Sequence, residues 1–456
     1  MLTAESQIAS PDRLLERLSY ARSRSDALFD LVRPESLYER PIPERHRIIF
    51  YVGHLEAFDW NLLTRSLAKR AADGLESVHP GFDRLFAFGI DPVGGGLPTD
   101  VPSDWPTLDA VRDYVSKVRN VLDEHLATAI QGSDARSPNE SSHDEFPLFT
   151  LLNVAVEHRL MHVETLSYML HQLPLNMKLR QTDSPRPRVQ PAIPKLIVVP
   201  AGVVTLGLPR NSDSFGWDNE FEVNTVDVPG FEIDQYKVTN RQYLEFMAAG
   251  GYDRRSFWND ADWNWKNTNN ISHPLFWKPD GNQWLWRTMF DEVSLPLDWP
   301  VYVSHAEASA YARWAGKSLP TEAEWQRAAY GSPDGDRRTY PWGNEPPTAS
   351  SQRGNFDFRN WDPAPVNAFP EGQSAFGVHD MSGNGWEWTS SVFAPFPGFE
   401  PFPFYRGYSA DFFDGKHFVM KGGSARTAAC MLRPTFRNWF QAHYQYVYAG
   451  FRCVRR

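Results

Sequence analysis

In the first part of the chain, apolar side chains recur at the spacing of one helix face. The pattern starts after Ser10-Pro11-Asp12, where a serine cap precedes a proline at the first helical position, and it predicts four helices. Their stripes contain Leu14, Leu18 and Ala21; Ile48, Val52, Leu55, Phe58 and Leu62; Leu108, Val111, Val115, Val118, Leu122 and Leu126; and much of the run from Pro147 to Pro174. Consecutive amphipathic helices of this kind predict an up-down four-helix bundle.

Two segments between these helices interrupt the pattern. Residues 89–106 contain three consecutive glycines and four prolines, and we expect a long loop there. Residues 132–144 are polar and rich in serine, and we expect no regular structure in them.

The pattern changes after a proline-rich stretch, 176–194, which predicts an extended linker. Beyond it, short apolar runs predict strands at 196–199, 203–206 and 231–234, and helices are expected at 240–250, at 305–316 and after a cap at Thr321. The sequence therefore predicts an α + (α+β) fold. It consists of a bundle over residues 1–180, a linker over 181–194 and a mixed domain over 195–456.

Composition narrows the class of protein. A chain of 456 residues is expected to form two or three domains, and its net charge of −10 argues against nucleic acid as the main partner. No apolar run is long enough for a membrane span, and no signal sequence is visible, so we expect a cytoplasmic protein. The two cysteines, Cys430 and Cys453, allow neither a disulfide framework nor a paired-cysteine zinc site, and we expect both to be buried.

A histidine pair in the fourth predicted helix indicates a metal site. His158 and His162 are four residues apart, so both imidazoles lie on one helix face, as two ligands of one metal ion do. Glu164 is roughly 200° round the helix from His162 and is expected to point elsewhere. A third ligand is wanted from another helix, and spacing alone leaves His54 and His125 open, ahead of His143 and His171. A pair of this kind also occurs on surfaces without any metal.

The second half contains a series of phrases that resemble the formylglycine-generating-enzyme (sulfatase-modifying-factor) domain, which has a C-type-lectin-like fold. The phrases are Trp217-Asp218-Asn219-Glu220, Leu319-Pro320-Thr321-Glu322-Ala323-Glu324-Trp325, Tyr340-Pro341-Trp342-Gly343, Gly383-Asn384-Gly385-Trp386-Glu387-Trp388, Gly422-Gly423-Ser424 and Ala449-Gly450-Phe451-Arg452. The first half resembles the DinB-like bundle, whose metal ligands are one histidine on the second helix and a His-x3-His on the fourth. That resemblance selects His54, His158 and His162.

The two domains in this order resemble the ergothioneine-biosynthesis sulfoxide synthases, including the related selenoneine synthases. The resemblance implies Fe(II) held by the three histidines, with O2 as co-substrate. It implies a reaction that joins a thiol sulfur to the imidazole C2 of hercynine and oxidises that sulfur to a sulfoxide. The segment Thr435-Phe436-Arg437-Asn438-Trp439 matches the family's active-site segment. Trp439 is then expected to contact the trimethylammonium group of hercynine, and Asn438 its imidazole or carboxylate.

Three departures from the family bear on the sulfur donor. Phe440 stands where members that use γ-glutamylcysteine have an aspartate, Met161 stands where they have a glutamine, and residues 86–96 lack their paired arginines. A carboxylate or amine of γ-glutamylcysteine would then lack a charged partner. The sequence therefore favours free cysteine, or another small thiol or selenol.

Other side chains are candidates for the same site. The family needs a tyrosine that donates a proton, and Tyr405 and Tyr408 are the candidates. Arg433 and Arg437 are expected to hold a substrate carboxylate or to form structural ion pairs. Asp59 is expected on the surface, with orientation of a ligand imidazole as the alternative.

Three further functions remain open from the sequence. The first is a selenoneine synthase that joins a selenosugar to hercynine, and the second is an ovothiol-type synthase. The third is a non-catalytic protein that binds a metal or a ligand. The retention of three histidines together with Asn438 and Trp439 favours an enzyme over the third alternative.

Overall fold

A computed structural model describes most of the chain. The described residues are 11–68, 75–89, 97–131, 147–181, 189–212, 214–347 and 352–456. The predicted irregular segment 132–144, the prolines at 185 and 187, the glycines at 94–96, Ser10 and His143 lie outside the described residues. The contacts divide the chain into two compact units, one built mainly from Glu5–Gln181 and the other mainly from Thr182–Ser212 and Gly216–Arg456.

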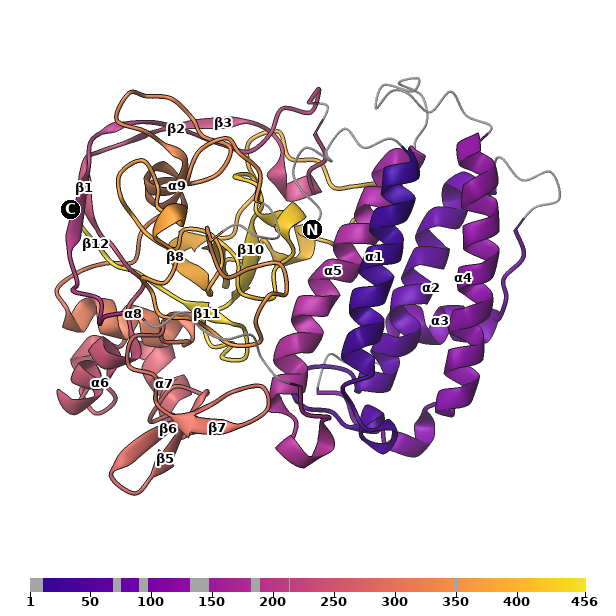
Figure 1. Ribbon diagram of the computed structural model, residues 1–456, viewed down its shortest axis with the longest axis horizontal. Helices are drawn as coiled ribbons and strands as arrows, with labels where there is room; N and C mark the ends of the chain where they lie inside the picture. Colours follow the sequence, from indigo (N-terminus) through magenta and orange to yellow (C-terminus); the bar gives the residue numbers. More distant parts are fainter. Residues whose placement is uncertain are drawn as a thin grey trace. The chain divides into compact units, whose positions relative to one another are not determined.

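The first unit is a helical bundle (Figure 1). Its helices are α1 (Pro11–Phe29), α2 (Ile48–Leu67), α3 (Pro80–Phe88), α4 (Leu108–Gln131) and α5 (Leu148–Gln172). Leu14, Leu55, Leu122 and Leu160 exemplify the apolar stripes, and each is at most 1% exposed. The four predicted helices are confirmed, and α5 lies beside both α1 and α2.

Helix α3 was not predicted. With only nine residues, the helix is too short to show a clear helical repeat of apolar positions. Proline and glycine at its first two positions also resemble loop sequence. The side chain of His79 caps it by accepting the amide N–H of Phe82, and Pro80 occupies the first helical position. Helix α3 packs on α2, where the bare backbone of Gly53 leaves space for the ring of Phe86.

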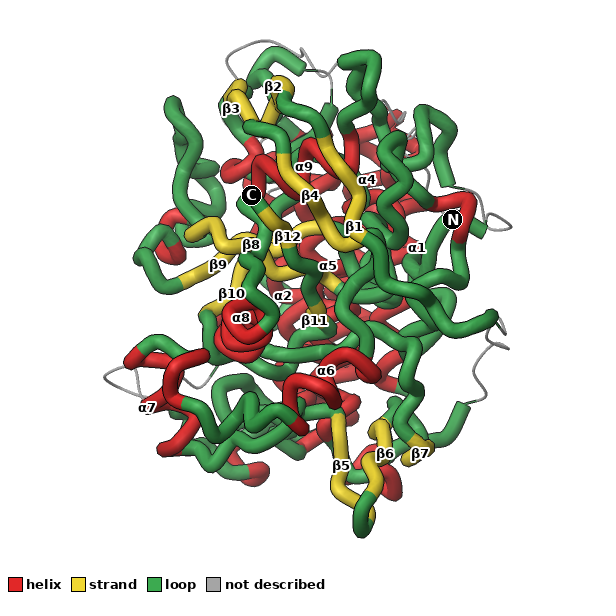
Figure 2. Tube along the Cα trace, turned by 90° about the vertical axis from the view of Figure 1, so that its left-hand side faces the viewer, coloured by secondary structure: helices red, strands yellow, loops and turns green. Residues whose placement is uncertain are grey.

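The second unit contains small sheets connected by long loops. Its strands are β1 (Leu196–Val199), β2 (Gly202–Leu206), β3 (Asn224–Val228), β4 (Phe231–Asp234), β5 (Trp277–Asp280), β6 (Gln283–Arg287), β7 (Glu292–Ser294), β8 (Trp386–Val392), β9 (His417–Lys421), β10 (Asn438–Gln441), β11 (Ala449–Gly450) and β12 (Val454–Arg455). The sheet orders are β1-β4-β12, β10-β9-β8-β11, β2-β3 and β5-β6-β7. Figure 2 shows the first of these sheets, with β4 between β1 and β12.

Helices α6 (Asn240–Ala248), α7 (Asp260–Thr268), α8 (His305–Trp314) and α9 (Glu322–Tyr330) complete this unit. The predicted cap at Thr321 is confirmed, since its hydroxyl accepts the amide N–H of Glu324 and the Glu324 carboxylate accepts the amide N–H of Thr321. Helix α7, strand β3 and strands β5–β12 were not predicted, because they are short and lie in a part of the sequence rich in glycine, proline and tryptophan. A helical bundle followed by a mixed α and β unit confirms the predicted fold class.

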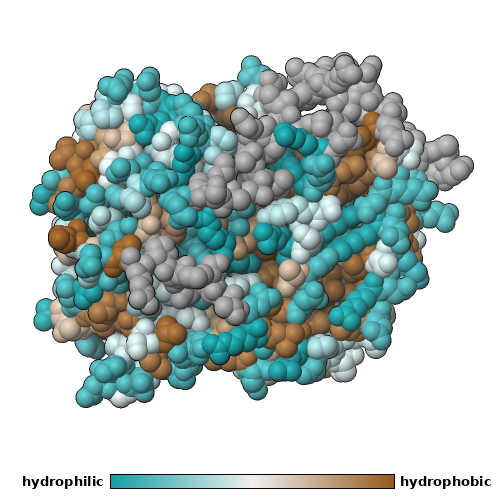
Figure 3. All heavy atoms as spheres, in the orientation of Figure 1, coloured by the Kyte–Doolittle hydropathy of each residue, from teal (hydrophilic) through white to brown (hydrophobic). Residues whose placement is uncertain are grey.

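Both cysteines are buried free thiols, as expected. Hydrophilic residues predominate on the face drawn in Figure 3, and hydrophobic ones are interspersed among them. In the described part of the chain, each helix is either too short or too polar to cross a bilayer.

Candidate metal centre

The predicted histidines meet between two helices of the bundle. His54 lies on α2, and His158 and His162 lie one turn apart on α5. One ligand atom from each imidazole lies within 4.8 Å of those of the other two, and the ring centroids are 4.5–5.5 Å apart. Of the two histidines that spacing left open, the structure brings His54 into this group. His125 on α4 is not part of it in the described residues.

A backbone carbonyl fixes the tautomer of His54. The Nδ1 atom lies 2.7 Å from the carbonyl oxygen of Phe86. Since a carbonyl can only accept, Nδ1 carries the hydrogen and Nε2 keeps a lone pair available to a metal ion. The carbonyl comes from α3, so the unpredicted helix orients one of the three imidazoles.

Aromatic rings hold the imidazole planes. Phe58 stacks on His158 at 3.5 Å between ring centroids and 11° between planes, and Phe50 stacks on His54 at 4.7 Å and 26°. Tyr51 lies 5.6 Å from His162. Each of these aromatic residues lies on α2, so a single helix supplies one ligand and a ring beside each of the three.

The site keeps its histidines neutral. Burial is the main cause that lowers the pKa of His54 to about 4, and Arg159 adds to the effect. Burial, the other histidines and Arg159 also hold the pKa of His158 and His162 well below the ordinary value. Neutral imidazole is the form that binds metal ions. Among the described residues the buried Nδ1 of His162 has no hydrogen-bond partner, so this donor set fits a metal ion.

A buried ion cluster joins the same two helices. Arg159 on α5 is 1% exposed, and its guanidinium donates to Glu56 at 2.9 Å and to Asp59 at 2.6 Å, both on α2. Arg119 on α4 also donates to Glu56, and it reaches Asp26 on α1. The cluster therefore ties four helices together beside the histidines. The neighbouring charges of Arg159 and Arg119 outweigh burial and lower the pKa of Glu56 to about 2.

The expected surface position of Asp59 is wrong. Its side chain is fully buried, because it lies on the face of α2 that meets Arg159. The signal was present in the sequence, since Glu56 and Asp59 are three residues apart on one helix face and Arg159 directly follows a predicted ligand. Glu164 is also buried.

In the second unit, three of the predicted substrate-binding residues, Asn438, Trp439 and Phe440, lie on β10, an edge strand. Trp439 stacks on Phe393 at 4.1 Å and 6°, and Phe440 stacks on Tyr444 at 4.8 Å and 13°. Because neighbouring side chains alternate along a strand, Trp439 points to one face of the sheet and Asn438 and Phe440 to the other.

The two candidate tyrosines are close together. Their ring centroids are 5.5 Å apart, and Tyr408 lies 5.4 Å from Trp439. Tyr408 also stacks on Trp217 at 4.0 Å. Burial and nearby Asp218 raise the pKa of Tyr405 to about 12, so its hydroxyl keeps its proton at neutral pH.

The two candidate arginines hold carboxylates of this chain. Arg433 donates to both oxygens of Glu220, and Arg437 donates to both oxygens of Glu322 at 2.9 and 3.1 Å. Arg433 is 9% exposed and Arg437 is 3% exposed. The structural alternative is therefore realised for both, and a role in holding a substrate carboxylate stays a prediction. Met161, on α5 beside His162, is half-buried, and its contact with a thiol also stays a prediction.

Two known families match the chain. The sulfatase-modifying factor enzyme 1-like domain matches residues 181–456, and the DinB superfamily matches residues 17–166. The chain is thus a two-domain protein in which a DinB-type bundle precedes a domain of the sulfatase-modifying-factor type.

Individual proteins that are similar to the chain narrow this family further. The chain is 38% identical over 307 residues to a hercynine oxygenase of Mycolicibacterium smegmatis, covering 66% of this chain and 70% of that protein. It is 43% identical over 254 residues to a hercynine oxygenase of Mycolicibacterium thermoresistibile, covering 54% and 55%. It is 29% identical over 507 residues to ergothioneine biosynthesis protein 1 of Neurospora crassa, covering 92% and 55%.

The chain belongs to the family of the hercynine oxygenases and ergothioneine biosynthesis proteins, which confirms the resemblance found in the sequence. The match spans only 55% of the length of the Mycolicibacterium thermoresistibile and Neurospora crassa proteins.

The ion cluster should be essential to the stability of the bundle. Replacing Arg159→Met leaves Asp59 buried without its cation, so we expect a loss of about 3–5 kcal/mol in the free energy of unfolding. Urea unfolding measures it. The exposed Arg112 on α4 provides the control, and Arg112→Met should change stability by less than about 0.5 kcal/mol. Equal effects of the two substitutions would contradict a structural role of the cluster.

The neutral histidines should make stability depend on pH. Their pKa values are lower in the folded chain than in the unfolded one, so the unfolded chain binds more protons below pH 6.5. The free energy of unfolding is not reduced by these histidines above pH 6.5. It falls as the pH drops towards 4, and His54 alone accounts for about 3 kcal/mol of that fall. Thermal unfolding of chelator-treated protein between pH 7 and 4.5 tests this. In His54→Gln the melting temperature should fall less steeply as the pH is lowered. An unchanged dependence on pH would be evidence against a buried, neutral His54.

Proposed function

We propose that this protein is a sulfoxide synthase that depends on non-haem Fe(II) and O2. It forms a C–S bond between the imidazole C2 of hercynine and a small thiol, which we take to be cysteine. The observation that carries the proposal is the group of three neutral histidines on α2 and α5, in a chain whose relatives are named hercynine oxygenases. Three imidazoles would leave positions on Fe(II) open for a thiol and for O2, which are the two reactants that the iron must bring together.

We assign the iron ligands as His54, His158 and His162. Bound iron would supply O2 activation and would lower the pKa of a bound thiol. The protein's own part is orientation. The Phe86 carbonyl holds the hydrogen on Nδ1 of His54, and the stacked rings of Phe50 and Phe58 restrain two imidazoles. Restrained ligands preserve the geometry of the site when the metal leaves and returns.

We assign the hercynine pocket to the region of β10. The electron-rich face of Trp439 suits a trimethylammonium group, and the Asn438 amide suits an imidazole or carboxylate. Tyr405 and Tyr408 are the candidate proton donors. Their position supports this assignment, since the ring centroid of Tyr408 lies 5.4 Å from that of Trp439 and that of Tyr405 lies 5.5 Å from Tyr408.

The choice of cysteine rests on Phe440. Its ring stacks on Tyr444 and has no charge to offer an ammonium or carboxylate group. γ-Glutamylcysteine is larger and carries two carboxylates and an ammonium group, and a charged group placed against this ring would lose solvation without a partner. A neutral selenosugar fits the same surface, so selenoneine synthesis is the second candidate. The ovothiol-type reaction and a non-catalytic metal-binding role are further outcomes of the tests below.

We further propose that residues 1–180 form the iron-binding domain, 181–194 a linker and 195–456 the substrate domain. We also place the reaction in the cytoplasm. Two buried free thiols suit a reducing compartment, and a thiol substrate stays reduced in it.

Replacing His158→Ala should abolish both iron binding and turnover, because two imidazoles hold Fe(II) far more weakly than three. The measurement is iron per chain after anaerobic reconstitution and desalting, together with product formation. His125→Ala is the matched control, since His125 lies on α4 outside the histidine group and should leave both values unchanged. Turnover that survives the loss of His158 would be incompatible with the proposed iron site.

The sulfur donor can be tested directly. We expect iron-loaded protein, given hercynine and O2, to yield hercynyl-cysteine sulfoxide with cysteine and much less product with γ-glutamylcysteine, as read by mass spectrometry. Phe440→Asp should raise the use of γ-glutamylcysteine relative to cysteine. Product formed only from a selenosugar would indicate a selenoneine synthase instead. No product from any donor, despite bound iron, would rule out hercynine as the acceptor.

A further inference from the structure

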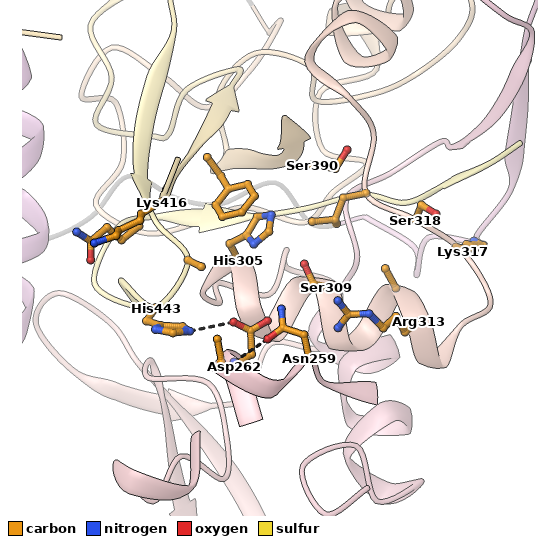
Figure 4. A pocket seen from close by; sticks show the side chains of 16 residues that line it. Asn259, Asp262, His305, Ser309, Arg313, Lys317, Ser318, Ser390, Lys416 and His443 are labelled. Carbon is orange, nitrogen blue, oxygen red and sulfur yellow. Dashed lines mark hydrogen bonds and ion pairs between the residues drawn. The ribbon is translucent and has the colours of Figure 1, made fainter. Parts of the chain in front are cut away.

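The second unit contains a pocket that the proposed reaction does not use. Its volume is about 580 Å³, within the usual range for small-molecule sites. The lining comes from α7, from α8 and the segment after it, from β8 and β9, and from the end of β10 and the residues that follow it. It includes none of the predicted substrate or catalytic residues. Figure 4 shows His305 near the centre, with His443 and Asp262 on one wall.

The pocket lies on the face of the sheet opposite to Trp439. Phe418 on β9 pairs with Phe440 on β10, and directly paired residues share a face. Trp439 is the neighbour of Phe440 and so points the other way. Phe418 lines the pocket, where its ring stacks on His305 at 3.7 Å and 17°.

The walls are fixed by interactions of their own. His305 is 7% exposed, and its Nε2 lies 3.2 Å from the Thr389 carbonyl, to which it donates. His443 donates through Nε2 to Asp262 at 2.9 Å, and its ring lies flat on Trp265 at 4.6 Å and 1°. Flat, restrained rings and a buried hydrogen-bonded carboxylate form a preorganised surface.

The charge of the pocket is positive, although the chain as a whole is negative. Arg313, Lys317 and Lys416 line it, against one carboxylate, Asp262, which His443 already engages. Lys317 is paired with Asp234 at 2.5 Å. Arg313 and Lys416 are exposed and hold no carboxylate in the part of the chain that the structure describes, although one nitrogen of Arg313 donates to the Phe257 carbonyl at 2.8 Å. Figure 4 shows Lys416 on one side of the pocket and Arg313 on the other.

We propose that this pocket binds a small organic anion with an acidic group at each end and a planar body between them. The acidic groups meet Lys416 and Arg313, and the planar body lies against the stacked pair that Phe418 and His305 form. The arrangement of the cations favours two acidic groups over one. A positively charged ligand is disfavoured, because the accessible charges of the lining are positive.

Benzene-1,4-dicarboxylate is the probe, with benzoate, inorganic phosphate and benzamidinium for comparison, and titration calorimetry of the full-length protein is the measurement. We expect the dicarboxylate to bind more tightly than benzoate or phosphate, and benzamidinium not to bind. Lys416→Gln and Arg313→Gln should each weaken dicarboxylate binding about threefold, and the double variant about tenfold. Both side chains are exposed, so the variants should fold normally.

The exposed Lys278, outside the pocket, provides the control, and Lys278→Gln should leave the affinity unchanged. Higher salt should weaken binding to the unsubstituted protein and affect the double variant less. Equal affinity for benzoate and the dicarboxylate, no binding of the dicarboxylate, or the same affinity in the double variant and the control would overturn the proposal.

Discussion

The ion pairs of Arg159 are the constraint on which the proposed metal centre depends. His54 and the other two histidines lie on different helices, so their geometry is only as fixed as the packing of α2 against α5. Apolar side chains tolerate small sliding, whereas a buried guanidinium between Glu56 and Asp59 does not, because any shift leaves a buried charge without its partner. Arg159 directly follows His158, so the same turn of α5 carries the ligand and the residue that fixes its register.

The second unit uses the same device around β8. Glu387 on this strand is fully buried, and Arg452 near the chain end donates to both of its oxygens while Lys237 lies 3.3 Å away. Arg452 also donates to backbone carbonyls of Asp234 and His379. With few long helices and small sheets, this unit has little regular packing to define it. Buried cations that donate hydrogen bonds to carbonyl oxygens of several loops fix the positions of those loops instead.

The sequence predicted the features that a helical repeat or a local motif determines. Long amphipathic helices such as α4 and α5 bury one stripe, so their pattern is strong, and the histidine spacing follows from the helix itself. Helix α3 and Asp59 were missed because their places depend on tertiary contacts. The nine-residue α3 is stabilised by its packing on α2, and Asp59 is buried only because Arg159 meets it there. Spacing could not choose between His54 and His125, since both are mid-helix, and the resemblance made that choice.

Strand β10 connects the proposed substrate site with the anion pocket. Its four residues present Trp439 to one face and Phe440 to the other, and the chain then continues into Ala442 and His443, which line the pocket. The hydrogen bond from His443 to Asp262 anchors this continuation to α7. As an edge strand, β10 has one neighbour in the sheet, β9, to hold it in place. Lys416 directly precedes β9, and Arg313 lies on α8. An anion held by these two side chains would therefore contact the immediate surroundings of the short strand that carries the predicted hercynine-binding residues.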